Sequence, residues 1–360
     1  MVIPLVAAAL LIPMTYSNKQ SLLNSKYQAN MLIWVMLLVV SINIIFRDFS
    51  YIDTGTYTYD FSSMTSYTLK ETFLYNSTNE PLFVIVSWIV AHFTENPRIY
   101  LAVLWVVFIV PFYLSLNRMY KPWQVAVIIF SYLNFGFFYS YSSNVLRQGI
   151  SIAFIILSLS YYLMGQKNKK PYVFLTVGCL FHWTGISAAV AVILLIKTNI
   201  KLRYLLGFWM LSALLYVTNL NAKLVAPFAG IIPKFDVYSS TSALQAYSNQ
   251  TNRLDFLLFS AVWVAIGIVL YYFFYREDEY LRIIKAYIVL NSLFVLCGFL
   301  AFSDRIAAYS WFLIPLLIWH PIVKAKKYSW IMAAVVMILF LVVGFYTDTI
   351  KYLDPYKLFS

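Results

Sequence analysis

Long apolar runs separated by short polar segments make up most of the sequence. Several runs extend over about 18 residues with almost no charge, which is the length that a helix needs to cross the hydrocarbon layer of a membrane. Clear examples are residues 29–46, 98–117, 254–275 and 329–347. The strict alternation over ten-residue segments that marks a membrane β-barrel is absent from the sequence, and in lipid only helices and closed barrels satisfy the backbone hydrogen bonds. The pattern therefore predicts an all-α fold, a polytopic bundle of transmembrane helices.

Together the apolar runs predict about 11–12 membrane segments, some of them re-entrant or broken helices. Residues 1–16 count as a first span, because no basic segment precedes them and no cleavage site of small residues follows. The sequence shows no repeat of fixed period and no polar stretch long enough to form a separate soluble domain. We therefore expect one integral membrane domain that covers residues 1–360.

Composition agrees with a membrane protein and argues against two other classes. Hydrophobic residues make up 62% of the chain and charged residues 11%, whereas a soluble domain averages about 45–50% and about 25%. The net charge of +12 does not indicate nucleic-acid binding, since the basic residues are spread over short loops between the apolar runs. Cys179 and Cys297 lie inside apolar segments, so we interpret them as packing residues rather than as a disulfide or a zinc site.

The basic residues also predict which loops face the cytoplasm. Five short loops contain Lys or Arg and no acidic residue, which is typical of cytoplasmic loops under the positive-inside rule. They are residues 17–28, 118–121, 165–170, 197–203 and 324–327. The two longer connections, residues 47–79 and 219–253, are then loops on the outer (periplasmic or extracellular) face.

This topology requires an irregular segment between Lys170 and Lys197. An even number of crossings must separate these two residues, although the sequence between them resembles one long span. We therefore predict a broken hairpin that rises over residues 171–181, turns at residues 182–185 and returns over residues 186–196.

A second irregular segment is expected at residues 81–94. Two apparent helices lie between Glu80 and Asn117, that is, between an outer loop and a cytoplasmic loop. One of them, at residues 81–94, must therefore be re-entrant or lie along the membrane interface. Its interruption at residues 95–97, Glu-Asn-Pro, is typical of a turn.

Several ionisable residues lie where the predicted spans reach the outer face. Such groups are costly at membrane depth and are functional candidates by default. They are Arg47, Asp53, Asp60, Glu80, Arg147, His182 and Arg305. Several guanidinium groups aimed at one cavity suit a pyrophosphate, because each offers a rigid fork of donors to phosphate oxygens. Each residue also has a simpler interpretation, since an arginine near a helix end can reach lipid headgroups and a lone histidine can pack among apolar residues.

Motifs for phosphate loops, zinc hydrolases, EF-hands and Rossmann cofactor sites are all absent from the sequence. Guanidinium groups can neutralise a pyrophosphate without a metal ion. We therefore expect no metal and no cofactor.

Five short motifs resemble those of the EpsG and Wzy group of bacterial polysaccharide polymerases. They occur in the same order as in that group, with comparable spacing, between residues 47 and 310. They are Arg47 followed by Asp53-x-x-x-Tyr57, then Asn79 to Phe83 (NEPLF), Leu146 to Ser151 (LRQGIS), Cys179 to Thr184 (CLFHWT) and Asp304 to Tyr309 (DRIAAY). The third motif differs from the family pattern, because Ser151 stands where alanine is usual.

The resemblance implies a GT-C-like glycosyltransferase of the bacterial cytoplasmic (inner) membrane. It would polymerise repeat units of O-antigen, capsule or exopolysaccharide, with undecaprenyl-pyrophosphate-linked glycans as donor and acceptor. Membrane lipid, a chain-length regulator and a flippase would be further partners, and nucleic acid would not. The growing chain would move to the new unit at the outer face, and negative charge would accumulate on the departing pyrophosphate.

The resemblance also implies roles for individual residues. Arg147 and Arg305 would act as pyrophosphate clamps, and Arg47 would be a third basic contact. Further residues would bind the pyrophosphate or the glycan, namely Gln148, Tyr57 and Tyr309.

The identity of a general base stays open. His182 would orient or deprotonate the acceptor hydroxyl, and Asp53 and Glu80 compete for this role. Pyrophosphate is already a good leaving group, so a strong base is not essential. Residues 219–253 match no motif of the family, and we expect them to shape substrate choice.

Other functions also remain open from the sequence. A flippase for lipid-linked oligosaccharides would also need a cationic cavity, although transporters usually show internal repeats and a site at the membrane midplane. A membrane acyltransferase with His182 as its base would need a path for the acyl donor and a second polar partner inside the membrane. A scaffold without enzymatic activity is the remaining alternative.

Overall fold

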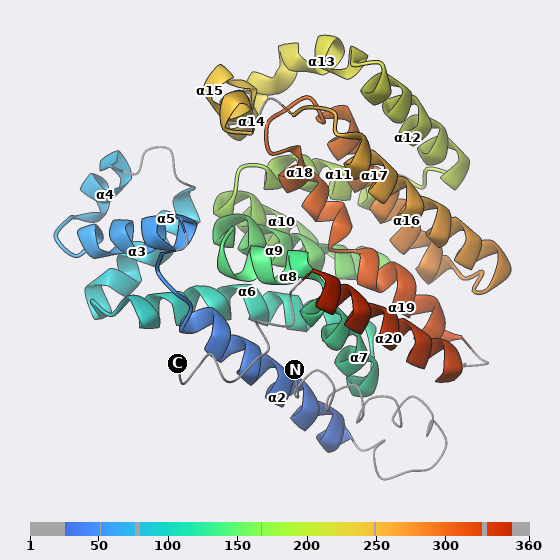
Figure 1. Cartoon of the computed structure of the whole chain (residues 1–360), viewed down its shortest axis with the longest axis horizontal. Coiled ribbons are helices and arrows are strands. Elements are labelled where there is room, and N and C mark those ends of the chain that lie inside the picture. The colour runs from blue at the N-terminus through green and yellow to red at the C-terminus, as the bar shows by residue number, and fades with distance from the viewer. Residues whose placement is uncertain are drawn as a thin grey trace. The chain divides into compact units, whose positions relative to one another are not determined.

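The structure is a computed structural model that describes residues 26–50, 52–75, 80–166, 168–247, 250–325 and 330–347. The first span predicted at residues 1–16 lies outside the described residues, as do parts of the predicted loops 17–28 and 324–327. Within the described ranges every regular element is helical, so the predicted all-α fold is confirmed. Figure 1 shows the order of the helices along the chain.

The chain divides into two compact units, residues 1–153 with 322–360 and residues 154–321. The first unit contains α2 (Lys26–Ile45), α3 (Ile52–Met64), α4 (Leu69–Tyr75), α5 (Pro81–Phe93), α6 (Pro97–Met119), α7 (Pro122–Leu133), α8 (Gly136–Ser143), the start of α9 (Leu146–Leu163) and α20 (Trp330–Tyr346). The prediction of a single membrane domain stays a prediction.

The second unit begins inside α9. It contains α10 (Lys170–Phe181), α11 (Gly185–Lys197), α12 (Leu202–Val217), α13 (Leu220–Val225), the 3₁₀ helix η2 (Ala226–Ile231), α14 (Pro233–Ser239), α15 (Thr241–Ala246), α16 (Leu254–Phe273), α17 (Asp278–Leu296), α18 (Ser303–Trp311) and most of α19 (Ile314–Lys324).

Five segments are long and apolar enough to cross a membrane, or seven if each of two sharply bent helix pairs counts as one span. The five are α2, α6, α9, α16 and the stretch from α18 through α19, and the bent pairs are α7 with α8 and α12 with α13 through η2. Four apolar helices are shorter than a full span, namely α5, α10, α11 and α20. Of these, α20 lies in the run at residues 329–347, which the sequence predicts as a full span. The chain is a multi-pass membrane protein with a helical bundle fold.

Helices end and restart at both predicted interruptions. The hairpin between Lys170 and Lys197 consists of α10 and α11, with the break at residues 182–184. The helix predicted at 81–94 is α5, which ends at Phe93, and Asn96 caps the next helix by accepting a hydrogen bond from the Arg98 backbone N–H at 2.9 Å. The sequence therefore located both interruptions correctly, and the re-entrant or interfacial position of α5 stays a prediction.

The predicted outer segments contain short helices. Residues 47–79 include α3 and α4, and residues 219–253 include α13, η2, α14 and α15. Four helices of the second unit are joined by buried polar side chains. Asn291 on α17 accepts a hydrogen bond from the Trp209 indole at 2.8 Å and donates to Ser260 and Ser310 at 2.9 and 3.0 Å. Such bonds between helices hold a bundle together where lipid offers no partners.

Candidate functional site

Arg147 forms an ion pair with a buried carboxylate in the first unit. Its Nη1 lies 2.9 Å from Glu80 Oε2, and the Glu80 side chain is fully buried whereas the Arg147 side chain is 21% exposed. The guanidinium also faces the rings of Tyr57 and Phe83, at 5.9 and 5.6 Å from their centroids. We call these four residues the Arg147 group. It ties the first turn of α9 to α3 and to the start of α5.

Gly149 explains why the LRQGIS motif needs a glycine directly after the buried Gln148. A β-carbon placed on Gly149 would lie 1.7 Å from the carbonyl oxygen of Tyr141, inside the contact distance of any two atoms. Only a residue without a side chain permits this approach of α9 to α8. The motif thus positions Arg147 through backbone packing, and Gln148 is completely buried beside it.

Two acidic residues of α3 lie in the same unit. Asp60 is half-buried, and burial raises its pKa above the ordinary carboxyl value, although the nearby positive charge of Arg147 opposes that shift. Asp53 lies in the first turn of α3, where its negative charge interacts favourably with the helix dipole, and it is partly exposed. The structure therefore brings Asp60 toward Arg147, which the sequence did not indicate.

Arg47 connects the end of α2 to α3. Its Nε donates a hydrogen bond to Thr54 Oγ1 at 2.9 Å, and its Nη1 donates to the Ile44 carbonyl. The side chain is buried, and among the described residues Nη2 has no hydrogen-bond partner. Burial lowers the pKa of Arg47 to about 10, so the group stays charged at neutral pH.

His182 lies at the break between α10 and α11 in the second unit. Its Nδ1 is 2.6 Å from Thr184 Oγ1, which is 3.1 Å from the Tyr309 hydroxyl. All three side chains are buried. We call these residues the His182 group, and it joins two of the predicted site residues through Thr184, which had been quoted only as part of a motif.

Arg305 contacts aromatic residues in the same unit. Its Nη1 donates to the Tyr238 hydroxyl at 3.2 Å, and its guanidinium lies 4.6 Å from the centre of the Phe302 ring. We call these three residues the Arg305 group. Tyr238 belongs to α14, within the segment that we expected to shape substrate choice, so this segment contacts a predicted clamp residue directly.

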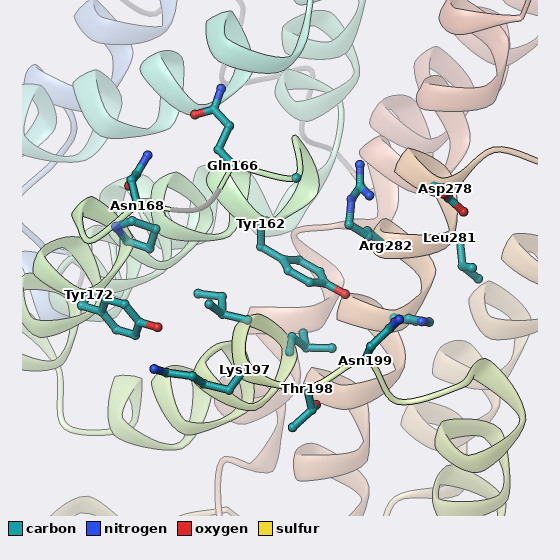
Figure 2. Close-up of a pocket in the computed structure, with 15 residues that line it drawn as sticks. Tyr162, Gln166, Asn168, Tyr172, Lys197, Thr198, Asn199, Asp278, Leu281 and Arg282 are labelled. Carbon is teal, nitrogen blue, oxygen red and sulfur yellow. The ribbon is translucent and has the colours of Figure 1, made fainter.

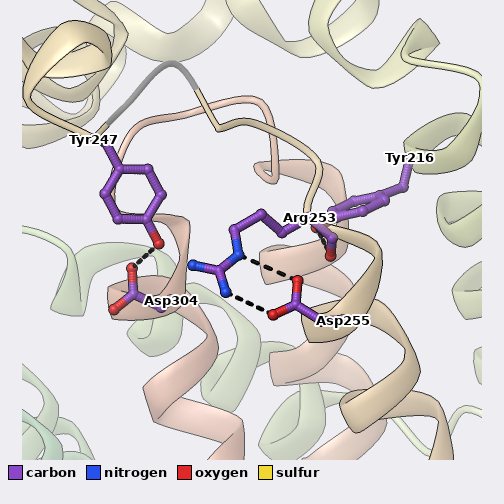
Figure 3. Close-up of polar contacts among 5 residues, drawn as sticks. All are labelled: Tyr216, Tyr247, Arg253, Asp255 and Asp304. Carbon is purple, nitrogen blue, oxygen red and sulfur yellow. Dashed lines mark hydrogen bonds and ion pairs between the residues drawn. The ribbon is translucent and has the colours of Figure 1, made fainter.

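The neighbouring Asp304 contacts the same segment. Tyr247 donates a hydrogen bond to Asp304 at 2.9 Å, and Arg253 donates to both carboxylate oxygens of Asp255 at 3.2 and 2.6 Å (Figure 3). Burial and the Asp304 charge raise the pKa of Tyr247, so the tyrosine keeps its proton at neutral pH. Asp304 and Arg305 thus each bind a tyrosine of residues 219–253.

The structure therefore assembles three groups of predicted residues. Glu80, Arg147 and Tyr57 meet in the first unit, and His182 and Tyr309 meet in the second. Arg305 has partners of its own. Convergence of Arg47, Arg147, His182 and Arg305 on one cavity stays a prediction, and so do the roles assigned to them.

Some residues of these groups could not be recognised from the sequence. Thr54 and Tyr238 lie in polar segments with many Ser, Thr and Tyr residues, where no spacing marks either of them. Among the residues that the structure describes, no three His, Cys, Asp or Glu side chains lie close enough to hold a metal ion. Metal independence stays a prediction.

Comparison with known proteins identifies the family. The family model of the EpsG family matches residues 30–358, which is most of the chain. The chain belongs to the EpsG family. All three groups described above lie inside the matched region, and membership gives this multi-pass membrane protein a role of the polysaccharide-polymerase type. No curated protein and no solved structure matches the chain.

Proposed function

We propose that this EpsG-family protein polymerises oligosaccharide repeat units linked to undecaprenyl pyrophosphate, at the outer face of the bacterial cytoplasmic membrane. The family match over residues 30–358 is the observation that carries the proposal. The enzyme would be a GT-C-like, metal-independent glycosyltransferase. An acceptor hydroxyl on one lipid-linked unit attacks the anomeric carbon of the donor glycan, and the bond from that carbon to pyrophosphate breaks.

Stabilisation of the departing pyrophosphate is the main electrostatic task of such a site. Arg147 and Arg305 supply guanidinium donors for it, and both side chains remain partly exposed. Arg47 adds positive charge, and its buried Nη2 is a donor that a shift of the surrounding side chains would uncover. Gln148 lies next to Arg147 in the first turn of α9, and the ring of Tyr57 on α3 faces the Arg147 guanidinium.

The proton of the acceptor hydroxyl needs a place to go. The chain from His182 through Thr184 to Tyr309 can hold the imidazole in one orientation and pass a proton along hydroxyl groups. Glu80 is less suited to this task, because its buried carboxylate already accepts a hydrogen bond from Arg147. His182 is therefore the base that the geometry favours, and Asp53 is the remaining candidate.

The experiment is an in vitro reaction of the purified protein, reconstituted in lipid, with a synthetic repeat unit linked to lipid pyrophosphate. A ladder of products that differ by one repeat unit, with release of lipid pyrophosphate, supports polymerisation. Movement of unchanged substrate across the vesicle membrane would indicate a transporter instead. Acyl transfer to the glycan, detected by mass, would indicate an acyltransferase.

A further inference from the structure

The second unit contains an open pocket of about 790 Å³ that none of the predicted polymerase residues lines. Three segments form it, as Figure 2 shows: the turn from α9 into α10, the end of α11 with the residues after it, and the first two turns of α17. Two of these segments coincide with loops 165–170 and 197–203, which the positive-inside rule assigns to the cytoplasm. The pocket volume lies in the range of small-molecule sites, about 300–1,000 Å³.

Basic residues dominate the ionisable side chains of the lining. Arg282 and Lys285 are three residues apart on α17 and so share one face of the helix, and Lys197 comes from the end of α11. Asp278 is the acidic residue of the lining and is exposed to solvent. The pocket therefore has an excess of positive charge.

Lys285 is the cation that most needs an anionic partner. The residue is only 9% exposed, and the nearby charge of Asp278 attracts its ammonium group. Arg282 is close enough to repel it. One exposed carboxylate does not balance these two cations, and burial of an ammonium group is unfavourable, so a ligand with negative charge would lower this cost.

Of the other two cations, Arg282 is anchored to the backbone and Lys197 faces an aromatic ring. Arg282 Nε donates to the carbonyl oxygen of Leu163 at 2.8 Å, which fixes the guanidinium at the C-terminal end of α9. Gly165 has a φ of +66° and turns the chain after α9, and a β-carbon placed on it would lie 3.5 Å from the same guanidinium. Lys197 Nζ lies 5.6 Å from the centre of the Tyr172 ring at the pocket rim.

Neutral polar groups complete the lining. Asn168 fixes the start of α10 by accepting a hydrogen bond from the Lys170 backbone N–H at 3.0 Å, and Asn199 lies on the opposite segment. Amide groups and cations placed around one opening are typical of sites for phosphate oxygens. The anchored guanidinium of Arg282 and the low exposure of Lys285 distinguish this arrangement from isolated surface lysines.

We propose that this pocket binds a phosphate-bearing anion, separately from the polymerase site. The shared chemistry is one or two phosphate groups, supplied either by an anionic phospholipid headgroup or by a water-soluble phosphate compound. Because the ligand would contact three segments, its binding would hold α9, α11 and α17 together. Occupancy would therefore raise the thermal stability of the protein.

The test measures thermal unfolding of the full-length protein in phosphatidylcholine nanodiscs, titrated with inorganic pyrophosphate. The expected result is a rise in melting temperature for the wild-type protein and an apparent Kd at least about tenfold weaker for Lys285→Gln. Lys197→Gln changes an exposed residue at the pocket rim. It should therefore also weaken binding, without altering the packing of α17.

Two control variants separate this pocket from other binding. Lys201→Gln removes the same charge from an exposed residue near the pocket that does not line it, and Arg203→Gln removes an exposed arginine of α12 that does not line it either. Both should keep the pyrophosphate effect. Equal binding by Lys285→Gln, Lys197→Gln and the wild-type protein would overturn the proposal.

A second arm identifies the source of the phosphate. The same titration is repeated in nanodiscs that contain phosphatidylglycerol. If this lipid raises the melting temperature by itself and suppresses the pyrophosphate effect in the wild-type protein alone, the ligand is a headgroup. If pyrophosphate acts equally in both lipids, the ligand is water-soluble. No stabilisation by either probe would contradict the proposal.

Discussion

The two arginines proposed to clamp pyrophosphate have different partners. Arg147 pairs with the fully buried carboxylate of Glu80, whereas Arg305 donates to the Tyr238 hydroxyl and faces the Phe302 ring. A carboxylate partner lowers the net positive charge at Arg147, and a hydroxyl partner leaves the net charge at Arg305 unchanged. We infer that Arg147 also has a structural task in the first unit and that Tyr238 helps to position Arg305.

Removal of Glu80 should have the largest effect on stability. We expect Glu80→Ala to lower the free energy of unfolding by about 3 kcal/mol, because the change leaves the Arg147 guanidinium without its carboxylate in a largely buried place. Denaturant unfolding of the reconstituted protein measures this. Glu80→Gln keeps an acceptor for one hydrogen bond, so its free energy of unfolding should fall by less. A Glu80→Ala variant as stable as the wild-type protein would show that the pair is not structural.

The next largest loss of stability is expected for a change at Gly149, which lies on the same helix as Arg147. Gly149→Ala should lower the free energy of unfolding by about 2 kcal/mol, because its β-carbon would overlap the Tyr141 carbonyl oxygen and force α8 and α9 apart. Gly207 on α12 is the matched control, since a β-carbon there meets nothing within 4 Å. Gly207→Ala should be neutral or stabilise the protein by up to about 1 kcal/mol. Equal effects of the two changes would refute the packing account.

The Arg305 group should respond more weakly. Tyr238→Phe removes one hydrogen bond to Arg305 and keeps the ring, so we expect a loss of about 1 kcal/mol in unfolding free energy. If residues 219–253 position Arg305, the same variant should also shorten the polymer made in vitro. Full-length polymer from Tyr238→Phe would restrict that segment to a role in packing.

The smallest expected effect concerns pH. Burial raises the pKa of Asp60 in the folded protein, so folding favours its protonated form. The contribution of Asp60 to stability is fully present below its pKa in the unfolded protein, about 4. It is lost as the pH rises through its pKa in the folded protein. Wild-type protein should therefore lose stability relative to Asp60→Asn between these two values. A stability difference that does not change with pH would contradict this assignment.

Apolar patterning predicted the helices better than it predicted their contacts. The break at His182 was predictable because Lys170 and Lys197 both belong to cytoplasmic-type loops, which requires an even number of crossings. Helices α3 and α4 were not predicted, since residues 52–75 are rich in Ser, Thr and Tyr and have no apolar periodicity. Such segments become helical through packing against their neighbours rather than through their own pattern.

Pairings between distant residues could not be derived from one sequence. Glu80 and Arg147 are 67 positions apart, and Thr184 and Tyr309 are 125 apart. Glu80 and Arg147 were candidates because an ionisable group is costly in a membrane, but that argument does not identify the partner of either residue. The sequence therefore predicted several residues of the candidate site and none of the contacts that position them.

The most direct test of the account is the product ladder made in vitro from a lipid-pyrophosphate repeat unit by Arg147→Ala and Arg305→Ala, with Arg203→Ala as a control for loss of an exposed arginine. Circular dichroism and thermal unfolding of each variant establish that it is folded. The account predicts no products beyond the starting unit for Arg147→Ala and Arg305→Ala, and a wild-type ladder for Arg203→Ala. A full ladder from folded Arg305→Ala would contradict the proposed clamp.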